Sequence, residues 1–575
     1  MKQKYQKRIA LAAGKKPVTL LLKNCKVVNV FTQKINEGDL AIDSGKIVGM
    51  GEYEAENIID MEGKYVAPGL IDSHQHMESS LVTPRELAKV IVPRGTTTII
   101  ADPHEIANVC GLKGIEYMMS ETEDIPLNVF FMMPSCVPAT QFEKGGAILE
   151  AKDIAPLMSH DRVLGLGELM DYPAVIEGRE DVIDKVLLAD RKMIDGHGPL
   201  LTGKPLNAYR MTGVKTDHEC TNLKEMEEKL DLGMYISIRE GTAARDLENL
   251  IQGVNEKNLR RVMFCTDDKH PGDILLEGHI DHNIRKAIQL GIKPIQAIQM
   301  ATLNPAECYQ LRDIGAIAPG YDADLIVLDD LEDFKVTQVY KKGILVADHG
   351  KALFDLKTEV DLAVVDTVRV GTITEKDLQI KLKSDIARVI RMNPKSLLTN
   401  KVNRKVSVDA SGHFIYNPYI DILKMAVIDR YGSSQSIGLG LIENFNLQGG
   451  AIGTTIAHDS HNLIVVGDND KDMILVIETI KEMQGGVVVV SNGNIVKKLP
   501  LPVAGLMSTL PMEDVAAILE EMTQYIYQEM NGNPEVDPLM SLSFLALPVI
   551  PEIKLTDKGL FDVNKMCFIS VDVEG

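Results

Sequence analysis

The middle of the chain alternates short apolar runs with amphipathic segments. In segments such as 182–192 and 222–232, apolar residues recur at spacings of three and four, which predicts helices. Among these segments lie eight apolar runs that we expect to be strands: 69–76, 97–103, 128–134, 163–169, 193–199, 214–219, 234–240 and 261–268. Eight such units over roughly 235 residues match a (β/α)8 TIM-like barrel, which we place at 69–310. An open doubly wound sheet is the alternative, but no glycine-rich phosphate fingerprint follows the first strand.

Both flanks of the predicted barrel have a different pattern. Residues 18–66 and 314–351 alternate apolar with polar positions and are interrupted by Gly and Asp, which is typical of short strands. We therefore predict one small β-domain built from both flanks, with an N-terminal arm and its first part at 1–68 and its second part at 311–360. The remaining segments mix strand and helix patterns, which predicts a separate C-terminal α/β domain at 361–575.

Composition narrows the function classes. The chain has 575 residues, of which 45% are hydrophobic and 25% charged, which is ordinary for a soluble globular protein. A net charge of −21 disfavours nucleic acid or an anionic membrane as partner, because phosphate binding needs a basic field. The sequence shows no apolar stretch of about 18 residues and no convincing signal peptide. Seven cysteines without a CxxC pair predict free thiols in the cytoplasm.

Metal-ligating residue types follow the predicted strands. His74 and His76 are two residues apart, so on a strand they project from the same face. One His-x-His is a weak signal by itself. The carboxyl ends of barrel strands converge on one mouth, however, and six candidate ligands lie at such ends: His74, His76, Glu168, His197, His218 and Asp267.

The size of this set suggests two metal ions. A carboxylate such as Glu168 can bridge a pair of ions through its two oxygens. His74, His76 and Asp267 would complete one ion, and His197 and His218 the other. A mixed set of imidazoles and carboxylates without thiolate suits zinc, manganese or iron.

Several motifs carry a family resemblance. "GLIDSHQHMESS", with the trailing "IAPGYDADLIVLD", resembles the amidohydrolase superfamily. "ADPHEIANV", "DGHGP", "TDHEC" and "CTDDKHP", in this order, resemble the narrower bacterial adenine deaminase family, and the likeness extends to "GGAIGTTIAHDSHNLIVVG" near the C-terminus. The resemblance implies that adenine is hydrolysed to hypoxanthine and ammonia in purine salvage, by attack of metal-bound hydroxide at C6. It also implies two divalent ions, manganese or iron with zinc as an alternative. Glu168 stands where many superfamily members carry a carboxylated lysine.

We assign further roles to residues near these ligands. We expect Asp267 to receive the proton of the attacking water, and Asp268 to point away because side chains alternate on a strand. Glu219 and His104 are assigned to catalysis.

Glu105 and Glu240 are assigned to purine binding. For Glu105 the alternative is an ordinary helix start, in which Asp102 caps the helix and Pro103 occupies its first turn.

Two questions stay open at this stage. The polar segment 457–462, "AHDSHN", could reach the barrel mouth, but we favour a turn whose side chains satisfy backbone groups. A different amidohydrolase, acting on a cyclic amide or an N-acyl substrate, would show the same His-x-His. A catalytically silent scaffold is disfavoured because all six candidate ligands are present. We expect a small purine base as the partner and a homo-oligomer as the assembly.

Overall fold

Eight parallel strands form the centre of the molecule. The computed structural model describes residues 2–358, 360–394, 396–432 and 435–573. Its central strands are β6 (Leu70–Gln75), β7 (Thr96–Ala101), β8 (Asn128–Met133), β9 (Val163–Leu169), β10 (Met193–Gly196), β11 (Thr216–Asp217), β12 (Tyr235–Arg239) and β13 (Val262–Cys265). They pair as two parallel sheets, β10-β9-β8-β7-β6 and β11-β12-β13. Backbone hydrogen bonds join these sheets at both seams, from Asp267 to His74 at 3.0 Å and from Lys215 to Ile194 at 3.0 Å.

These strands are buried on both faces, as expected for a parallel sheet covered by helices. Apolar side chains such as Ile71, Ile100, Met132 and Met263 fill the lower interior, and Tyr309 packs with them. The predicted TIM-like barrel is thus confirmed. Its interior is apolar, and polar residues lie at the carboxyl ends of its strands.

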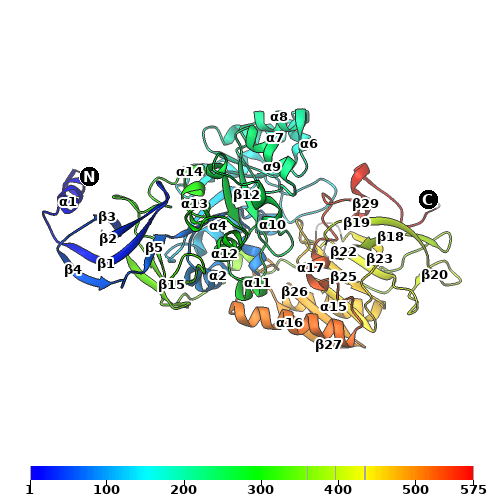
Figure 1. Cartoon of the computed structure of the whole chain (residues 1–575). Coiled ribbons are helices and arrows are strands. Elements are labelled where there is room, and N and C mark those ends of the chain that lie inside the picture. The colour runs from blue at the N-terminus through cyan, green and yellow to red at the C-terminus, as the bar shows by residue number, and fades with distance from the viewer. Residues whose placement is uncertain (1, 359, 395, 433–434, 574–575) are drawn as a thin grey trace.

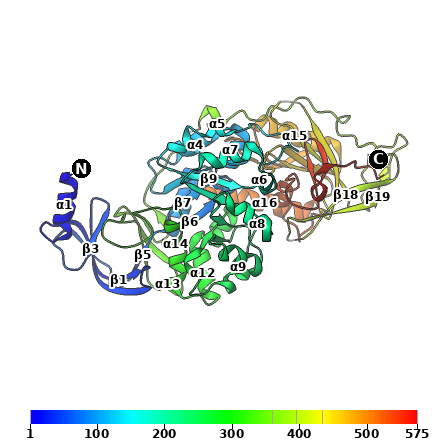
Figure 2. The same cartoon turned by 90° about the horizontal axis from the view of Figure 1, so that it is seen from above.

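Helices surround the strands, as Figure 2 shows for α4, α7, α9 and α12. The longer ones are α2 (Pro84–Ile91), α3 (His104–Cys110), α4 (Leu112–Glu121), α7 (Glu180–Leu188), α8 (Gly203–Met211), α9 (Leu223–Asp231), α12 (Ile280–Gln289) and α13 (Pro294–Met300). Shorter ones are α5 (Ala151–Ile154), α6 (Tyr172–Glu177), α10 (Leu247–Leu250), α11 (Pro271–Leu276) and α14 (Leu303–Cys308). Helix α9 illustrates why the spacing of apolar residues predicted a helix at 222–232. Asn222 caps its first turn by accepting from the Glu225 amide at 3.0 Å, and Met226 points into the core.

Strands from both flanks of the barrel share one nine-stranded sheet. It contains β1 (Val18–Asn29), β2 (Lys34–Asp43), β3 (Lys46–Met50), β4 (Ala55–Asp60), β5 (Tyr65–Pro68), β14 (Leu325–Leu328), β15 (Val336–Lys341), β16 (Ile344–Asp348) and β17 (Lys351–Ala352). The flanks meet where β14 pairs with β5, and Figure 1 shows green β15 near blue β5. A β-domain from both flanks is confirmed. The N-terminal arm contains a helix, α1 (Lys2–Ala12), which the sequence pattern did not predict.

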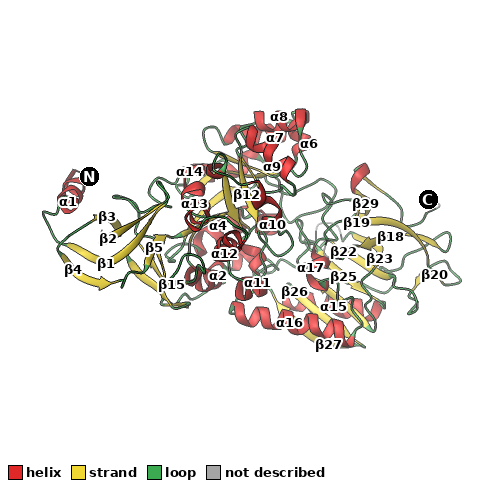
Figure 3. Ribbon diagram, in the orientation of Figure 1, coloured by secondary structure: helices red, strands yellow, loops and turns green. Residues whose placement is uncertain are grey.

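The C-terminal part is built on an eight-stranded sheet, at the right of Figure 3. Its strands are β18 (Ile386–Met392), β19 (Thr399–Lys405), β22 (Leu423–Ile428), β23 (Ile437–Glu443), β24 (Gly450–Thr454), β25 (Leu463–Gly467), β26 (Gly486–Ser491) and β27 (Asn494–Pro500). Smaller pieces are β20 (Ser407–Val408), β21 (Phe414–Ile415), β28 (Ile553–Thr556), β29 (Gly559–Asp562) and β30 (Cys567–Phe568). The helices are α15 (Asp470–Met483), α16 (Met512–Glu529) and α17 (Pro538–Ser543).

This C-terminal part docks close to the carboxyl end of the first barrel strand. Helix α16 lies against α11 and α2 of the barrel. The backbone of Ser508 pairs with Leu81 at 2.7 Å and Thr83 at 3.2 Å, just after the His-x-His segment. Among the described residues, no helix is both long and apolar enough to span a membrane.

Candidate active site

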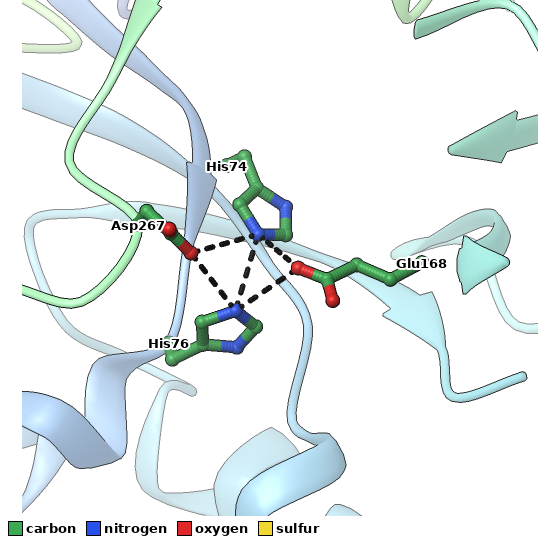
Figure 4. Close-up of side chains that lie close together, drawn as sticks. All are labelled: His74, His76, Glu168 and Asp267. Carbon is green, nitrogen blue, oxygen red and sulfur yellow. Dashed lines mark hydrogen bonds and ion pairs between the residues drawn. The ribbon is translucent and has the colours of Figure 1, made fainter. Parts of the chain in front are cut away.

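Four side chains converge at one side of the barrel mouth (Figure 4). His74 belongs to β6, and His76 follows its last residue. Their Nε2 atoms lie 3.2 Å apart, and each faces Glu168 Oε1, at 2.7 and 3.1 Å. Asp267 Oδ1 lies 3.4 and 3.2 Å from the same two nitrogens. All four residues are buried, so their donor atoms surround one point shielded from bulk water.

A second group shares the carboxylate of Glu168. His197 Nδ1 lies 3.2 Å from Glu168 Oε2, and His218 Nε2 lies 3.2 Å from Glu168 Oε1. The His218 ring stacks on His74 with centroids 4.2 Å apart, so the two groups are adjacent. Glu168 therefore presents one oxygen to the His74 group and its other oxygen to His197.

The donor atoms fit divalent cations. Ligands about 2.0–2.2 Å from a tetrahedral ion lie roughly 3.3–3.6 Å from one another. The His74 and His76 nitrogens lie 2.7 to 3.4 Å from each other and from the two carboxylate oxygens, which is at or slightly below this range. His197 Nδ1 and His218 Nε2 are buried and, although each lies 3.2 Å from a Glu168 oxygen, neither makes a hydrogen bond of suitable geometry to a described residue. Buried polar atoms without a partner are rare, and a cation would satisfy these two.

Hydrogen bonds orient the first group. His76 Nδ1 donates to the Asp102 carbonyl oxygen at 2.9 Å, which leaves Nε2 free to ligate. The Asp102 carboxylate in turn accepts from the Glu168 amide at 2.9 Å. The interpretation of Asp102 as a helix cap is therefore wrong, because α3 makes no side-chain cap and Asp102 holds strand β9 instead.

Charges in this region are strongly coupled. Burial lowers the pKa of His74, but Glu168 and Asp267 raise it to about 10. Burial alone would raise the pKa of Glu168, but the imidazoles of His218, His197 and His74 hold it well below its usual value. The carboxylate thus remains ionised, as a bridging ligand must be.

Asp267 reaches the site from beyond its strand. Strand β13 ends at Cys265, and Asp267 has a left-handed backbone with φ 57°. Side-chain alternation consequently does not govern this position, so the stated reason for separating Asp267 from Asp268 is wrong. Asp268 does have a different partner, because its Oδ1 accepts from Ser79 Oγ.

Glu219 and Arg239 lie at the edge of the second group. Glu219 Oε1 is 3.5 Å from His218 Nε2 and 3.7 Å from His197 Nδ1. The Arg239 guanidinium pairs with Glu219 and donates to Asp267 Oδ2 at 3.2 Å. The Arg239 guanidinium therefore links the carboxylate of Asp267, in the first group, to that of Glu219, beside the second group. Sequence reasoning missed Arg239, although its position at the end of β12 was a usable signal.

His104 and Glu105 connect the barrel to the C-terminal domain. The His104 ring lies 4.5 Å from that of His76, and its Nε2 is 3.7 Å from Glu105 Oε1. Glu105 Oε1 accepts from His458 Nδ1 at 2.7 Å, and its Oε2 accepts from His461 Nε2. The prediction that segment 457–462 is only a structural turn is therefore wrong, because His458 and His461 of this segment reach the barrel mouth.

Comparison with known proteins identifies the family. Residues 65–346 match the Amidohydrolase family, and residues 396–567 match the Adenine deaminase C-terminal domain. An adenine deaminase of Clostridium acetobutylicum is 51% identical over 567 residues, covering 98% of this chain and 99% of that protein. Adenine deaminases of Nitratidesulfovibrio vulgaris and Geobacillus kaustophilus are 48% and 46% identical, each alignment covering 98% of both chains.

The chain belongs to the adenine deaminase family. The resemblance stated from the motifs is confirmed, and the protein is a metal-dependent hydrolase. The amidohydrolase family uses divalent metal ions, and the two donor groups around Glu168 are clusters that could hold such ions.

One candidate residue of this adenine deaminase family member lies elsewhere. Glu240 is fully buried, but its Oε1 accepts from Lys286 Nζ at 2.6 Å and lies 3.9 Å from His282 Nε2. It follows the inward-pointing Arg239 on β12, so alternation turns it toward the surrounding helices. Glu240 is therefore not brought to the groups around Glu168, and Glu105 reaches them only through His104.

Proposed function

We propose that the protein hydrolyses adenine to hypoxanthine and ammonia, with two divalent ions held by the groups around Glu168. The observation that carries this proposal is the shared carboxylate of Glu168, which faces His74 and His76 with one oxygen and His197 with the other. Near-full-length relatives named adenine deaminase support the choice of substrate.

We further propose manganese or iron as the ions, with zinc also compatible with the ligand types. His74, His76, Glu168 and Asp267 would hold one ion. His197 and His218 would hold the other together with Glu168. When bound, such a pair supplies a water-derived nucleophile at neutral pH.

We propose that Asp267 moves the proton of the attacking water. Its Oδ1 lies among the first ligand group, while its Oδ2 accepts from Arg239. Burial raises the pKa of Asp267, but His74, His76 and Arg239 hold it well below its usual value. The ionised carboxylate can accept a proton at Oδ1 and return it to the departing amine.

Glu219 is the proposed proton carrier to ring nitrogen N1. Purine C6 is a poor electrophile, so protonation of N1 during attack promotes the reaction. Glu219 Oε1 lies within 3.7 Å of both His197 and His218, at the edge of the second group. His104, between His76 and Glu105, is proposed to help with proton transfer on the opposite side.

Ammonia release from a panel of substrates tests the proposal. The protein is grown with manganese, its metal content is determined, and adenine, adenosine, guanine, cytosine and dihydroorotate are compared. We expect two ions per chain and ammonia from adenine, with little or none from adenosine. Release from dihydroorotate or cytosine without release from adenine would assign the protein to another amidohydrolase activity.

We also propose that the protein acts in the cytoplasm. All seven cysteines are unpaired, which fits a reducing cytoplasm. The proposed role in purine salvage follows from the proposed adenine substrate. The homo-oligomer stays a prediction.

A further inference from the structure

A narrow cavity lies between the barrel mouth and the C-terminal domain. Barrel residues and residues of the C-terminal domain line it together, among them Glu78, Ser79, His270, Ile456, His458 and Leu506. The cavity lies near His76, because Glu78 and Ser79 belong to the short helical turn Met77–Ser80, which begins directly after His76. Its walls combine apolar and polar side chains, and its volume of about 10 Å³ holds little more than one water molecule.

Glu78 has an oxygen with no partner. Its Oε1 accepts from the Ile106 amide at 3.1 Å, at the start of α3. Its Oε2 is buried and has no hydrogen-bond partner among the described residues, and the side chain as a whole is almost fully buried. Leaving such an oxygen without a donor is costly. A ligand that brings a donor into the cavity would remove this cost.

We propose that Glu78 Oε2 accepts a hydrogen bond from the imidazole N–H of a free purine base, and so selects the base over its nucleoside. This inference rests on the proposed adenine deaminase function. Adenine has two kinds of donor, the amine on C6 and the ring N–H of its five-membered ring. The amine must face the metal-ligand groups, where it leaves, which makes the ring N–H the donor available to a carboxylate farther along the cavity.

A nucleoside lacks this donor because its sugar replaces the hydrogen. It would leave Glu78 Oε2 unpaired and would add a sugar to a cavity that is already too small for the base alone. A site built to hydrogen-bond a donor rejects analogues without it far more strongly than a purely apolar pocket does. Because the cavity is this small, the proposal requires its lining residues to move apart when the base enters.

The test compares adenine with 9-methyladenine in the wild type and in Glu78→Gln. The glutamine keeps an oxygen for the Ile106 amide but presents an NH2 group where Oε2 was. We measure kcat/KM for both compounds, together with the inhibition constant of 9-methyladenine against adenine. We expect Glu78→Gln to lose about 10- to 150-fold in kcat/KM on adenine, mainly through KM, the loss typical of a charge-assisted hydrogen bond. Its affinity for 9-methyladenine should change by less than about threefold.

Equal losses on both compounds would overturn the inference, because they would mean that Glu78 only supports the fold. The control is Glu86→Gln, which removes another buried carboxylate that pairs with Lys89 on α2, away from the cavity. If the wild type does not deaminate adenine at all, the proposed function fails. Calorimetric affinities of both compounds for wild type and Glu78→Gln then still decide whether Glu78 recognises the ring N–H.

Discussion

Individual side chains at the barrel mouth each have a distinct physical task. Glu168 is kept ionised by the imidazoles around it, while Arg239 links Asp267 to Glu219. Asp267 reaches this position through a left-handed backbone, a conformation that is uncommon for a residue other than glycine and that often marks functional sites. A carboxylate can accept and release a proton at neutral pH, whereas an amide of the same shape cannot. Replacing Asp267 by Asn therefore tests proton transfer separately from shape.

Replacing Asp267 with Asn should lower kcat on adenine by roughly 10²–10⁴-fold, the range for loss of general acid–base catalysis. Asn keeps nearly the same shape and can still present an oxygen to a cation, but it cannot carry a proton at neutral pH. The measurement is kcat with the metal content determined on the same preparation. Asp273→Asn is the control, because Asp273 pairs with Arg245 and Thr242 outside the ligand groups. Wild-type kcat in Asp267→Asn with both ions bound would show that another group moves the proton.

Lys554 predicts a pH dependence of stability in the C-terminal domain. Its side chain is fully buried, and burial lowers its pKa from 10.5 to about 7. Between these two pH values the unfolded chain binds more protons than the folded chain, so stability should rise with pH across this window. Each unit of pKa difference corresponds to about 1.4 kcal/mol.

Lys554→Met should therefore raise the Tm at pH 7, and the gain should shrink as the pH approaches 10. Thermal unfolding of both proteins from pH 6.5 to 10 measures this difference. Lys405→Met serves as the control, because the Lys405 side chain is 81% exposed. A gain that does not depend on pH would mean that Lys554 titrates near its ordinary value.

At the scale of elements, the sequence predicted the barrel strands better than their ends. The apolar runs are visible because parallel barrel strands are buried on both faces. Strand β11 covers only Thr216–Asp217, and β10 ends at Gly196, so His197 and His218 lie just beyond regular strand. At His197 and His218 the backbone leaves the two-residue repeat of a strand. No local sequence pattern predicts where this happens.

The segment 457–462 illustrates what local patterns cannot give. His458 and Glu105 are 353 positions apart, and His461 and Glu105 are 356 apart. Their contact depends on how the C-terminal domain docks on the barrel. From composition alone, a polar turn was the simpler interpretation.

His461→Gln should lower kcat/KM on adenine by about 10- to 100-fold while both ions remain bound. His461 Nδ1 accepts from the Ala457 amide at 3.3 Å, so its Nε2 carries the proton that it donates to Glu105. Loss of a buried hydrogen bond to a charged group typically costs about 1.5–3 kcal/mol. Steady-state kinetics with metal analysis provide the measurement, and His413→Gln, next to Asp409 on the C-terminal domain, is the control. Unchanged kcat/KM would show that the segment does not support the active site.

At the scale of the whole molecule, three parts cooperate in one site. The nine-stranded β-sheet contains strands from the chain before the barrel and from the chain after it. The first and last residues of the barrel segment are therefore held by the same sheet. The barrel supplies the proposed metal ligands, and the C-terminal domain contributes His458 and His461 to the adjoining cavity. The excess of acidic residues makes a neutral or cationic small substrate more compatible with the molecule than a polyanion.

The central claim is that adenine deamination depends on two ions shared through Glu168. The most direct test titrates manganese into metal-free protein and follows hypoxanthine formation from adenine as a function of ions bound per chain. Binding of both ions should be needed, so activity should rise until two ions are bound and then remain constant. Full activity with one ion bound, or hypoxanthine formation by the metal-free protein, would contradict the account.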